Sequence, residues 1–229
     1  MKKVLVLTGA GISAESGLKT FRDSDGLWEN YNVYDVATPQ AWSKNPALVQ
    51  EFYNKRREQC LSAKPNNGHL ALVELEKVFE VQIITQNVDD LHEKAGSSKI
   101  LHLHGELNKA RSTVDENLIY DITGKEIKMG DKCEKGSQLR PHIVWFGEMV
   151  PNIEIAQEMM HDADYLLIIG TSLNVYPAAG LVHFVPPYCH TFLIDPNDCP
   201  TGNISNLTIV KEGAGTGVPK AIKMMTVKV

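Results

Sequence analysis

Short apolar runs alternate with longer segments of helical spacing along most of the chain. The apolar runs are bounded by polar residues or glycine and predict strands at residues 4–7, 81–84, 100–103, 165–169 and 191–194. Segments with helical periodicity, residues 68–79 and 153–161, lie between several of these runs. This alternation is typical of a parallel sheet covered by helices on both faces, so the expected fold class is α/β and Rossmann-like.

Two stretches break this rhythm. Residues 16–42 are rich in glycine, aspartate and aromatic residues without a sustained period, and we expect a long functional loop there. Residues 107–139 are polar and weakly β-like, with three glycines, and predict a small inserted lobe. Between the two stretches, Asn45 as N-cap and Pro46 at the first helical position predict a helix that continues to residue 61.

Composition is that of an ordinary globular protein. The chain has 229 residues, of which 43% are hydrophobic and 22% charged, and its formal net charge is -5. No block of Lys or Arg is long enough to bind nucleic acid or an anionic membrane, and no apolar run approaches the ~20 residues that cross a bilayer. Because Met1-Lys2-Lys3 leads directly into a strand, we expect a cytoplasmic protein. Its four scattered cysteines form no Cys-x-x-Cys pair and indicate reduced thiols.

Polar and small residues gather where the predicted strands end. Ligands of parallel sheets bind beyond the carboxyl ends of the strands, so we expect these positions to share one edge and to form a site. In chain order the clusters are Thr8-Gly9, Thr85-Gln86-Asn87, His104-Gly105, Gly170-Thr171-Ser172 and Asp195-Pro196-Asn197.

Two glycine-containing turns favour a dinucleotide. The run Gly9-Ala10-Gly11-Ile12-Ser13-Ala14 matches G-x-G-x-x-A, whose glycines let the backbone approach a pyrophosphate. The run Gly170-Thr171-Ser172-Leu173 offers a second small turn with hydroxyls. Taken singly, the first could be a plain strand-to-helix turn and the second a turn whose hydroxyls cap the next helix. The acidic ribose reader about 20 residues beyond such a motif has no clear counterpart, so we expect a cofactor held differently from that of an ordinary dehydrogenase.

His104 is the candidate proton acceptor. A strand precedes it and Gly105 follows it, so its ring is expected at a strand end, where a histidine can take up a proton near neutral pH. A lone histidine is more often structural or solvated, but Asn87 and Asp89 at a neighbouring strand end could order a ligand beside it. His102 shares the strand face of His104; whether the pair binds a metal stays open, and no third ligand is evident.

Six motifs, in order, resemble the sirtuins, the NAD-dependent protein lysine deacylases. They are Gly9-Ala10-Gly11-Ile12-Ser13, Thr20-Phe21-Arg22, Thr85-Gln86-Asn87-Val88-Asp89, His104-Gly105-Glu106, Val144-Trp145-Phe146-Gly147-Glu148 and Gly170-Thr171-Ser172. The resemblance runs from residue 4 to about residue 215. It implies one catalytic domain over residues 1–229, with a Rossmann-like part at approximately 1–30, 68–106 and 140–229. The small lobe would comprise approximately residues 31–67, which are helical, and 107–139.

The resemblance implies NAD as the cofactor, with three groups of residues around it. The pyrophosphate would be cradled by Gly9, Ala10, Gly11 and Ile12. The reacting ribose and the nicotinamide would be covered and held by Phe21, Arg22, Gln86, Asn87 and Asp89. The adenosine end would be lined by Gly170, Thr171, Ser172, Asp195, Asn197 and Ala214.

In the family's reaction, the acyl oxygen of the substrate displaces nicotinamide at the anomeric carbon of the ribose. The position of His104 is that of the general base, which deprotonates a ribose hydroxyl that then attacks the resulting imidate, with Asn87 and Asp89 beside it. The products are free lysine, nicotinamide and O-acyl-ADP-ribose. Because nicotinamide is already a good leaving group, the protein mainly orients the reactants, excludes water and supplies one base.

The substrate implied by the resemblance is an acylated lysine side chain of a protein. Two segments resemble the strands that sandwich the substrate peptide through backbone pairing, which tolerates many side chains. Their residues are Val144, Phe146, Gly147, Glu148, Asn174 and Val175.

Tyr53 and Arg56 stand three residues apart on the helix predicted after Asn45 and therefore face one way. They resemble the Tyr-x-x-Arg pair of sirtuins that prefer succinyl and malonyl groups, since a guanidinium and a phenol suit a carboxylate. Without the resemblance, the charge run around Lys55 and Arg57 would indicate an exposed helix face. Arg57 would meet Tyr53 about as well on geometry, and only the family pattern selects Arg56.

The chain departs from most sirtuins in the small lobe. Those proteins carry two Cys-x-x-Cys pairs that bind structural zinc between the His-Gly-Glu and Phe-Gly-Glu motifs. Here that interval contains only Cys133, and Arg111 and Ser112 lie about where the first pair would begin. One thiolate cannot complete a tetrahedral site, so we predict no zinc and a lobe held by packing and hydrogen bonds.

The function predicted from the sequence is an NAD-dependent protein lysine deacylase of the desuccinylase and demalonylase type, with deacetylation as well. We expect a monomer with no nucleic-acid or membrane partner. One alternative is the same fold transferring ADP-ribose to a protein. Another is a non-catalytic nucleotide-binding domain, like the central domain of thiamine-dependent enzymes, which would have no use for Asn87, Asp89 and His104 together.

Overall fold

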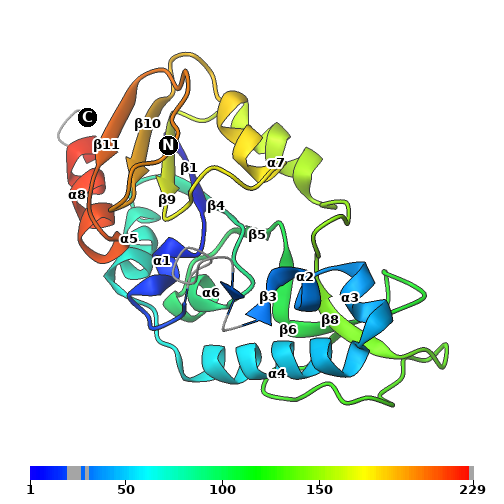
Figure 1. The fold of residues 1–229 in the computed structure, drawn as a ribbon. Helices are drawn as coiled ribbons and strands as arrows, with labels where there is room; N and C mark the ends of the chain where they lie inside the picture. Colours follow the sequence, from blue (N-terminus) through cyan, green and yellow to red (C-terminus); the bar gives the residue numbers. More distant parts are fainter. Residues whose placement is uncertain (20–26, 29–30, 227–229) are drawn as a thin grey trace.

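A six-stranded parallel sheet forms the larger part of the protein (Figure 1). The structure is a computed structural model, and it describes residues 1–19, 27–28 and 31–226. The strand order is β11-β10-β9-β1-β4-β5, and every neighbouring pair is parallel. The bounds are β1 Lys3–Thr8, β4 Glu80–Thr85, β5 Ile100–His102, β9 Tyr165–Ile169, β10 His190–Ile194 and β11 Leu207–Val210. The α/β fold class expected from the sequence is confirmed.

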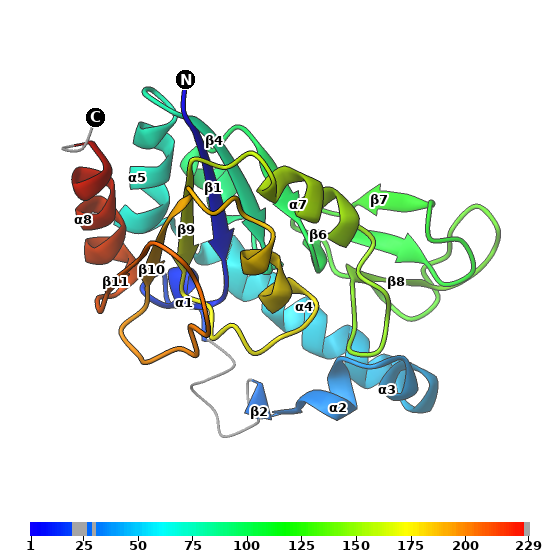
Figure 2. The same ribbon diagram turned by 90° about the horizontal axis from the view of Figure 1, so that it is seen from above.

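The central strands are apolar because helices cover them on both faces. In Figure 2, α5 Asn67–Leu75 and α8 Ala214–Thr226 lie on one face, and α7 Ile153–Met160 and η2 Ala178–His183 lie on the other. Alternate residues of β1 contribute to the two resulting cores, with Val4 and Val6 on the side of α5 and α8 and Leu5 and Leu7 on the opposite side. No helix among the described residues is long and apolar enough to span a membrane.

A three-stranded antiparallel sheet and several helices form the small lobe. The sheet has the order β7-β6-β8, with β6 Gly105–Ser112, β7 Ile119–Asp121 and β8 Leu139–Ile143. The small sheet therefore continues to Ile143, past residue 140 at which we placed the boundary. The helix predicted after Asn45 is α4 Pro46–Ser62, and the Asn45 side chain accepts a hydrogen bond from the backbone N–H of Leu48 at 3.1 Å.

The prediction of one long loop over residues 16–42 was wrong in its second half. That half contains β3 Tyr31–Asn32, α2 Val33–Val36 and α3 Pro39–Lys44, and β3 pairs with β2 Leu27–Trp28. The side chains of Asn32 and Thr38 cap the two helices, with Pro39 at the first turn of α3. These capping signals were visible in the sequence, but helices of four and six residues are too short to show a period.

Side chains of α4 tie the small lobe together. Asn54 donates to the carbonyl of Ile127 at 2.9 Å and accepts from its N–H at 3.0 Å, so a single amide pairs with the backbone as a strand would. Arg57 donates through Nε to the carbonyl of Leu107 at 2.6 Å, and Gln50 donates to the carbonyl of Leu139 at 2.7 Å. These bonds connect α4 to β6, to β8 and to the loop before β8.

Candidate functional site

The turns after β1 and β9 pack backbone against backbone at the carboxyl edge of the sheet. Gly11 N–H donates to the carbonyl of Gly170 at 2.8 Å, and Gly9 N–H donates to the carbonyl of Ile169 at 3.0 Å. A Cβ added to Gly9 would lie 2.8 Å from Gly170 O, and one added to Gly11 would lie 2.6 Å from Gly170 Cα. Gly170 itself has a φ of +61°. The two glycine turns singled out in the sequence therefore form one surface of small residues. The helix α1 Gly11–Ala14 begins at this surface, with Gly11 as its first residue.

Asn87 and Asp89 lie beside these turns and share a hydrogen-bonded link through Ser13. Asn87 Nδ2 donates to Gly9 O at 3.1 Å and to Ser13 Oγ at 3.2 Å, and Ser13 Oγ donates to Asp89 Oδ2 at 3.0 Å. Asp89 Oδ1 accepts from the N–H of Leu91, the first residue of α6 Leu91–Ala95. Burial raises the pKa of Asp89 above its usual range, although its hydrogen bonds act in the opposite direction. Sequence reasoning gave Ser13 no role, although it stands within the glycine motif.

Gln86 joins the carboxyl ends of three strands. Its Nε2 donates to Thr171 Oγ1 at 3.0 Å, after β9, and its N–H donates to Thr8 O at 2.9 Å, at the end of β1. The carbonyl of Gln86 accepts from His104 Nδ1 at 3.0 Å, just beyond β5. Residues from four separate chain segments, including the Asn87 loop, therefore meet at one edge, as the sequence predicted for these clusters.

The hydrogen bond of His104 decides its tautomer. A carbonyl oxygen can only accept, so Nδ1 carries the proton, and the lone pair of the neutral ring lies on Nε2. Burial lowers the pKa of His104 below its usual value, while the bond to Gln86 partly opposes this. The ring is therefore neutral at pH 7, which suits it to accept a proton through Nε2.

A buried polar network missed in the sequence lies beneath the site. Thr8 Oγ1 donates to Thr85 Oγ1 at 2.7 Å and lies 3.1 Å from His92 Nε2, and the rings of His92 and His69 meet edge to face at 5.0 Å. Desolvation lowers the pKa of His92 well below its usual value and that of His69 to about 4, so both rings stay neutral. Nothing in the spacing of these residues predicted that they would meet.

The residues expected at the adenosine end follow β9 and β10 or lie at the start of α8. Asp195 is buried, and its Oδ1 accepts from the N–H of Asn197 at 2.9 Å, while Asn197 itself is exposed. Ala214 begins α8, where Glu15 accepts from the N–H of Gly215 at 3.2 Å. The turn after β9 is held by Thr171, whose hydroxyl accepts from Leu173 N–H at 3.3 Å, and Ser172 is half-buried.

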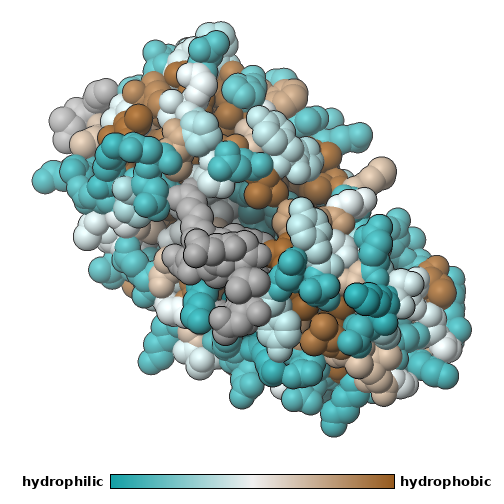
Figure 3. Space-filling view, viewed as in Figure 1, coloured by the Kyte–Doolittle hydropathy of each residue, from teal (hydrophilic) through white to brown (hydrophobic). Residues whose placement is uncertain are grey.

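Two of the expected cofactor residues, Phe21 and Arg22, lie outside the described residues. In the space-filling view of Figure 3, a hollow lies between the two parts of the molecule, with hydrophobic side chains at its rim.

The two segments expected to pair with the substrate peptide form no strand in the protein by itself. The segments containing Val144, Phe146 and Gly147 and those containing Asn174 and Val175 are turns or irregular backbone. Gly147 has a φ of +91°, which a strand does not adopt. Both segments are nonetheless exposed over much of their length, at Phe146, Asn174 and Val175.

Glu148 points into the protein rather than outward from its turn. Its carboxylate accepts from Arg140 at 2.7 and 3.2 Å, from Arg111 at 3.1 Å and from the N–H of Trp145 at 2.8 Å. Arg140 also stacks on the Trp145 ring, at 3.2 Å from its centroid. Burial raises the pKa of Glu148, but the bonds from Arg140 and Trp145 outweigh it, and the net pKa lies below the usual value.

Tyr53, Arg56 and Arg57 are all buried, so the exposed-face interpretation of this part of α4 was wrong. Lys55, in an ion pair with Glu51, and Glu58 face solvent. Arg57 contacts the backbone of the small lobe, as described above, and its other bond goes to Asn54 Oδ1 at 2.6 Å. Burial raises the pKa of Tyr53 well above its usual value, although the charges of Arg140 and Arg56 oppose this, so the phenol stays protonated.

No group of three or more His, Cys, Asp or Glu side chains arranged to hold a metal ion is found within the described ranges. The Cys133 thiol instead lies in the lobe beside Ser112, with Sγ donating to Oγ at 3.3 Å. His102 and His104 use their Nδ1 atoms on successive backbone carbonyls, those of Asn87 and Gln86.

The chain is similar to known proteins over most of its length. The model of the Sir2 family matches residues 9–177. The chain belongs to the Sir2 family. An NAD-dependent protein deacylase of Bacteroides thetaiotaomicron is 54% identical over 230 residues, covering 98% of both chains, and one of Helicobacter pylori is 51% identical over 228 residues, covering 98% of this chain and 99% of the relative.

Solved Sir2 structures share the whole architecture. A Sir2 homolog–NAD complex has a TM-score of 0.88 at 39% sequence identity, covering 99% of this chain and 90% of its own. A Sir2 homologue mutant in complex with ADP ribose has a TM-score of 0.89 at 38% identity, covering 100% of this chain and 94% of its own. The six-stranded parallel sheet with a small antiparallel sheet is thus the Sir2 fold.

Proposed function

We propose that this Sir2 protein removes succinyl and malonyl groups, and acetyl groups as well, from lysine side chains of proteins. The observation that carries the acyl preference is the burial of Tyr53 and Arg56 on the inner face of α4. The general activity rests on broader ground: the protein is an NAD-dependent protein deacylase, in line with its full-length relatives. The non-catalytic alternative is thereby set aside.

NAD fits the edge of the sheet where the two glycine turns meet. Because a Cβ on Gly9 or Gly11 would collide with Gly170, this surface consists of backbone groups that a pyrophosphate can approach closely. We assign the pyrophosphate to residues 9–12, the adenosine to residues 170–172, 195–197 and 214, and the nicotinamide ribose to Gln86, Asn87 and Asp89. NAD supplies a ribosyl carbon that carries a good leaving group.

His104 is assigned as the general base of the reaction. Its neutral ring, with the proton fixed on Nδ1 by Gln86, offers Nε2 to a ribose hydroxyl. Asn87 and Asp89 hold the sugar, and the bonds through Ser13 keep both side chains in place before the substrate arrives. The protein thus contributes orientation and one base, with O-acyl-ADP-ribose, nicotinamide and free lysine as the products.

The case for an acidic acyl group rests on the chemistry of α4. Burying a guanidinium costs several kcal/mol, so a buried arginine beside a reaction site calls for a role. The charge of Arg56 lowers the pKa of both Tyr53 on the same helix and Asp89 at the site, which supports a role for Arg56 near both. A protonated phenol and a guanidinium can together bind the carboxylate of succinyl-lysine or malonyl-lysine. Arg57 is committed to the small lobe, so the proposal concerns Arg56.

A comparison of acyl peptides tests this preference. We expect Arg56→Met to lower kcat/KM for a succinyl-lysine peptide by about a hundredfold, equivalent to the ~1.5–3 kcal/mol of a charge-assisted hydrogen bond, and to leave an acetyl-lysine peptide nearly unaffected. Tyr53→Phe should act in the same direction but less strongly. The matched control is Lys55→Met, which removes a positive charge from the solvent side of the same helix. An equal loss on both peptides with Arg56→Met would show that Arg56 is structural.

Protein ADP-ribosylation is the remaining alternative on this fold. Mass spectrometry of the products separates the two reactions, since deacylation yields O-acyl-ADP-ribose and a lighter peptide, whereas ADP-ribosylation yields a heavier protein.

A further inference from the structure

His102, the last residue of β5, and His104, two residues further on, hold two successive carbonyls of the loop after β4. His104 Nδ1 bonds to Gln86 O at 3.0 Å, and His102 Nδ1 bonds to Asn87 O at 3.1 Å. His104 is assigned as the base, but His102 has no role in the proposed reaction. Its side chain is 10% exposed, and its Nε2 lies 2.7 Å from Glu93 Oε1.

The partners of His102 determine its protonation. Asn87 O can only accept, so Nδ1 must carry a proton. Glu93 is 42% exposed, and although burial raises its pKa, the bond from His102 outweighs this and the net pKa is lowered, so it is ionised at neutral pH and also accepts. Both ring nitrogens therefore donate, and the ring is an imidazolium paired with a carboxylate.

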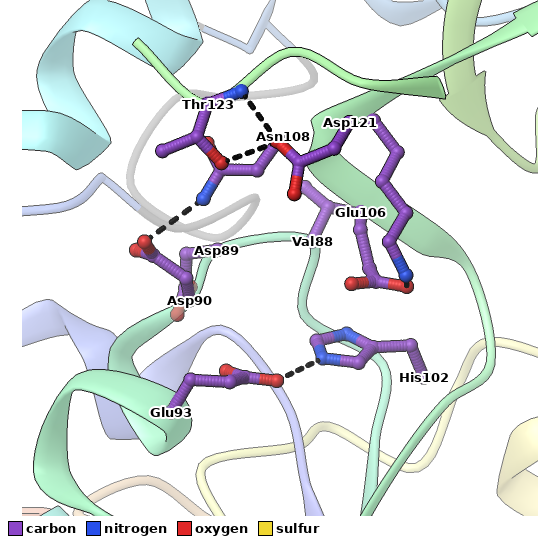
Figure 4. Close-up of a pocket in the computed structure, with 10 residues that line it drawn as sticks. Val88, Asp89, Asp90, Glu93, His102, Glu106, Asn108, Asp121 and Thr123 are labelled. Atoms are coloured by element: carbon purple, nitrogen blue, oxygen red, sulfur yellow. Dashed lines mark hydrogen bonds and ion pairs between the residues drawn. The ribbon is translucent and has the colours of Figure 1, made fainter. Parts of the chain in front are cut away.

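The surroundings of the ring favour this charged form. Figure 4 shows His102 between Glu93 of α6 and Glu106 of β6, at the end of a cavity of about 240 Å³. Burial lowers the pKa of His102, but Glu93, Glu106 and the Asn87 carbonyl raise it, and the net pKa lies above its usual value. Asp89 and His92 also interact electrostatically with the ring, and Asp90, Lys109 and Asp121 line the same cavity.

We propose that His102 is a positioning residue that, oriented by Glu93, fixes the backbone carbonyl of Asn87 so that the Asn87 side chain is held in the position that binds the cofactor. This inference rests on the proposed role of Asn87 in holding the nicotinamide ribose. The bond from His102 restricts rotation of the peptide group that contains Asn87 O. Asn87 is then held at two points, through this carbonyl and through the bond from its Nδ2 to Gly9 O. His102 touches neither substrate nor cofactor in this account and acts through Asn87.

Glu93 sets the direction of the pH effect. Because the folded pKa of His102 is raised, the clamp is complete below the usual histidine pKa and is lost as the pH rises through the folded pKa. A neutral ring has one proton for two acceptors, and the Glu93 carboxylate competes with Asn87 O for it. We therefore expect an alkaline limb in kcat that disappears in Glu93→Gln, because the uncharged amide can donate to Nε2 and leaves the Nδ1 proton for Asn87 O.

The test compares two substitutions of His102 with an exposed control. Asn carries its Nδ2 at the position of His Nδ1, so His102→Asn keeps a donor for Asn87 O and loses only Glu93, whereas His102→Leu loses both. We expect His102→Leu to lower kcat for nicotinamide release by about tenfold to a hundredfold, with the KM of the acyl peptide unchanged, and His102→Asn to retain most of the wild-type kcat.

The control is His161→Leu, which removes an exposed histidine at the end of α7 and should match the wild type. Equal kcat in His102→Leu and the wild type, or no rescue by Asn, would overturn the proposal.

Nitrogen-15 NMR of the intact protein gives a readout that needs no catalysis. We expect two protonated ring nitrogens for His102 at pH 7 and a pKa that falls in Glu93→Gln. A neutral His102 at pH 7, with unprotonated Nδ1, would overturn the proposal even in an active enzyme. Conversely, the expected NMR signature in a protein that releases no nicotinamide would mean that the proposed function fails while the clamp stands.

Discussion

Glu148 and Arg140 form a two-bonded ion pair inside the small lobe, with Nη1 to Oε1 at 2.7 Å and Nη2 to Oε2 at 3.2 Å. The same carboxylate accepts from the N–H of Trp145, and Arg140 Nη2 donates to Ile143 O at 2.9 Å. The pair therefore fixes the shape of the turn at residues 145–148 from the inside. The outer side of this turn stays exposed at Phe146 and Gly147, and we propose that the substrate peptide binds there.

Breaking this pair should weaken both stability and peptide binding. We expect Glu148→Gln to lower the free energy of unfolding by about 3 kcal/mol, since the two side chains are mostly buried and one partner is left without its counter-charge. The KM for the acyl peptide should rise while NAD binding is preserved. Urea unfolding and steady-state kinetics measure these effects, with the exposed Glu158→Gln of α7 as the control. A loss no larger than that of the control would contradict this account of the turn.

The pH dependence of the free energy of unfolding tests whether the charge of Glu148 is the source of its stabilisation. The folded pKa of Glu148 is lowered, so its stabilisation is present above the unfolded pKa of about 4.3 and is lost as the pH falls through the folded pKa. We expect the difference in unfolding free energy between wild type and Glu148→Gln to shrink below pH 4. A difference that stayed constant down to pH 3 would mean that charge is not its origin.

His104 should set the acid limb of the reaction. Because burial lowers its pKa, the neutral base persists below pH 6.5, and kcat/KM should begin to fall only at lower pH than for a solvated histidine. We expect His104→Ala to abolish nicotinamide release coupled to acyl removal, with NAD binding retained. The pH profile of the wild type and a binding titration of the variant check the two parts. Full activity in His104→Ala would refute the assignment of the base.

The apposition of Gly11 and Gly170 predicts a steric block to NAD. In Gly11→Ala the new Cβ would lie 2.6 Å from Gly170 Cα, so the turns must separate and the Kd for NAD should rise by about tenfold or more, a cost of ~1.4 kcal/mol. Gly17→Ala is the matched control, because Gly17 has a φ of +85° and meets no described atom within 4 Å. It should lose about 1 kcal/mol of stability through backbone strain with unchanged NAD affinity. Equal Kd values for the two variants would speak against the assigned pyrophosphate site.

The small lobe should fold without zinc through contacts such as those of Asn54. We expect dialysis against EDTA to leave the Tm unchanged, and Asn54→Leu to lower the free energy of unfolding by about 2–3 kcal/mol by removing its bonds to Ile127 and Arg57. Hydrogen exchange should quicken over residues 113–138 in this variant and stay unchanged in the exposed control Asn117→Ala. Stoichiometric zinc in the purified protein, or a Tm that falls with EDTA, would refute the prediction.

The sequence predicted the parts of the fold whose signals are local. The central strands are continuous apolar runs because both faces of the sheet are covered, and Asn45-Pro46 marks the start of α4 by capping chemistry. Strand β11 was missed because its four residues lie at the sheet edge, where half-exposed positions weaken the apolar pattern. The carboxyl-edge rule for parallel sheets correctly brought Gly9, Gln86 and His104 together.

What the sequence by itself determined is therefore the order of strands and helices, the family and the edge at which the polar clusters meet. Only the tertiary structure decided which way individual side chains face. It turned Glu148 inward to Arg140, committed Arg57 to the carbonyl of Leu107, and set His102 and His104 against successive carbonyls. The physical reason is that a residue's position in the period of a helix or strand fixes the face it lies on, whereas its hydrogen-bond partner can come from a distant part of the chain, 50 residues away for Arg57.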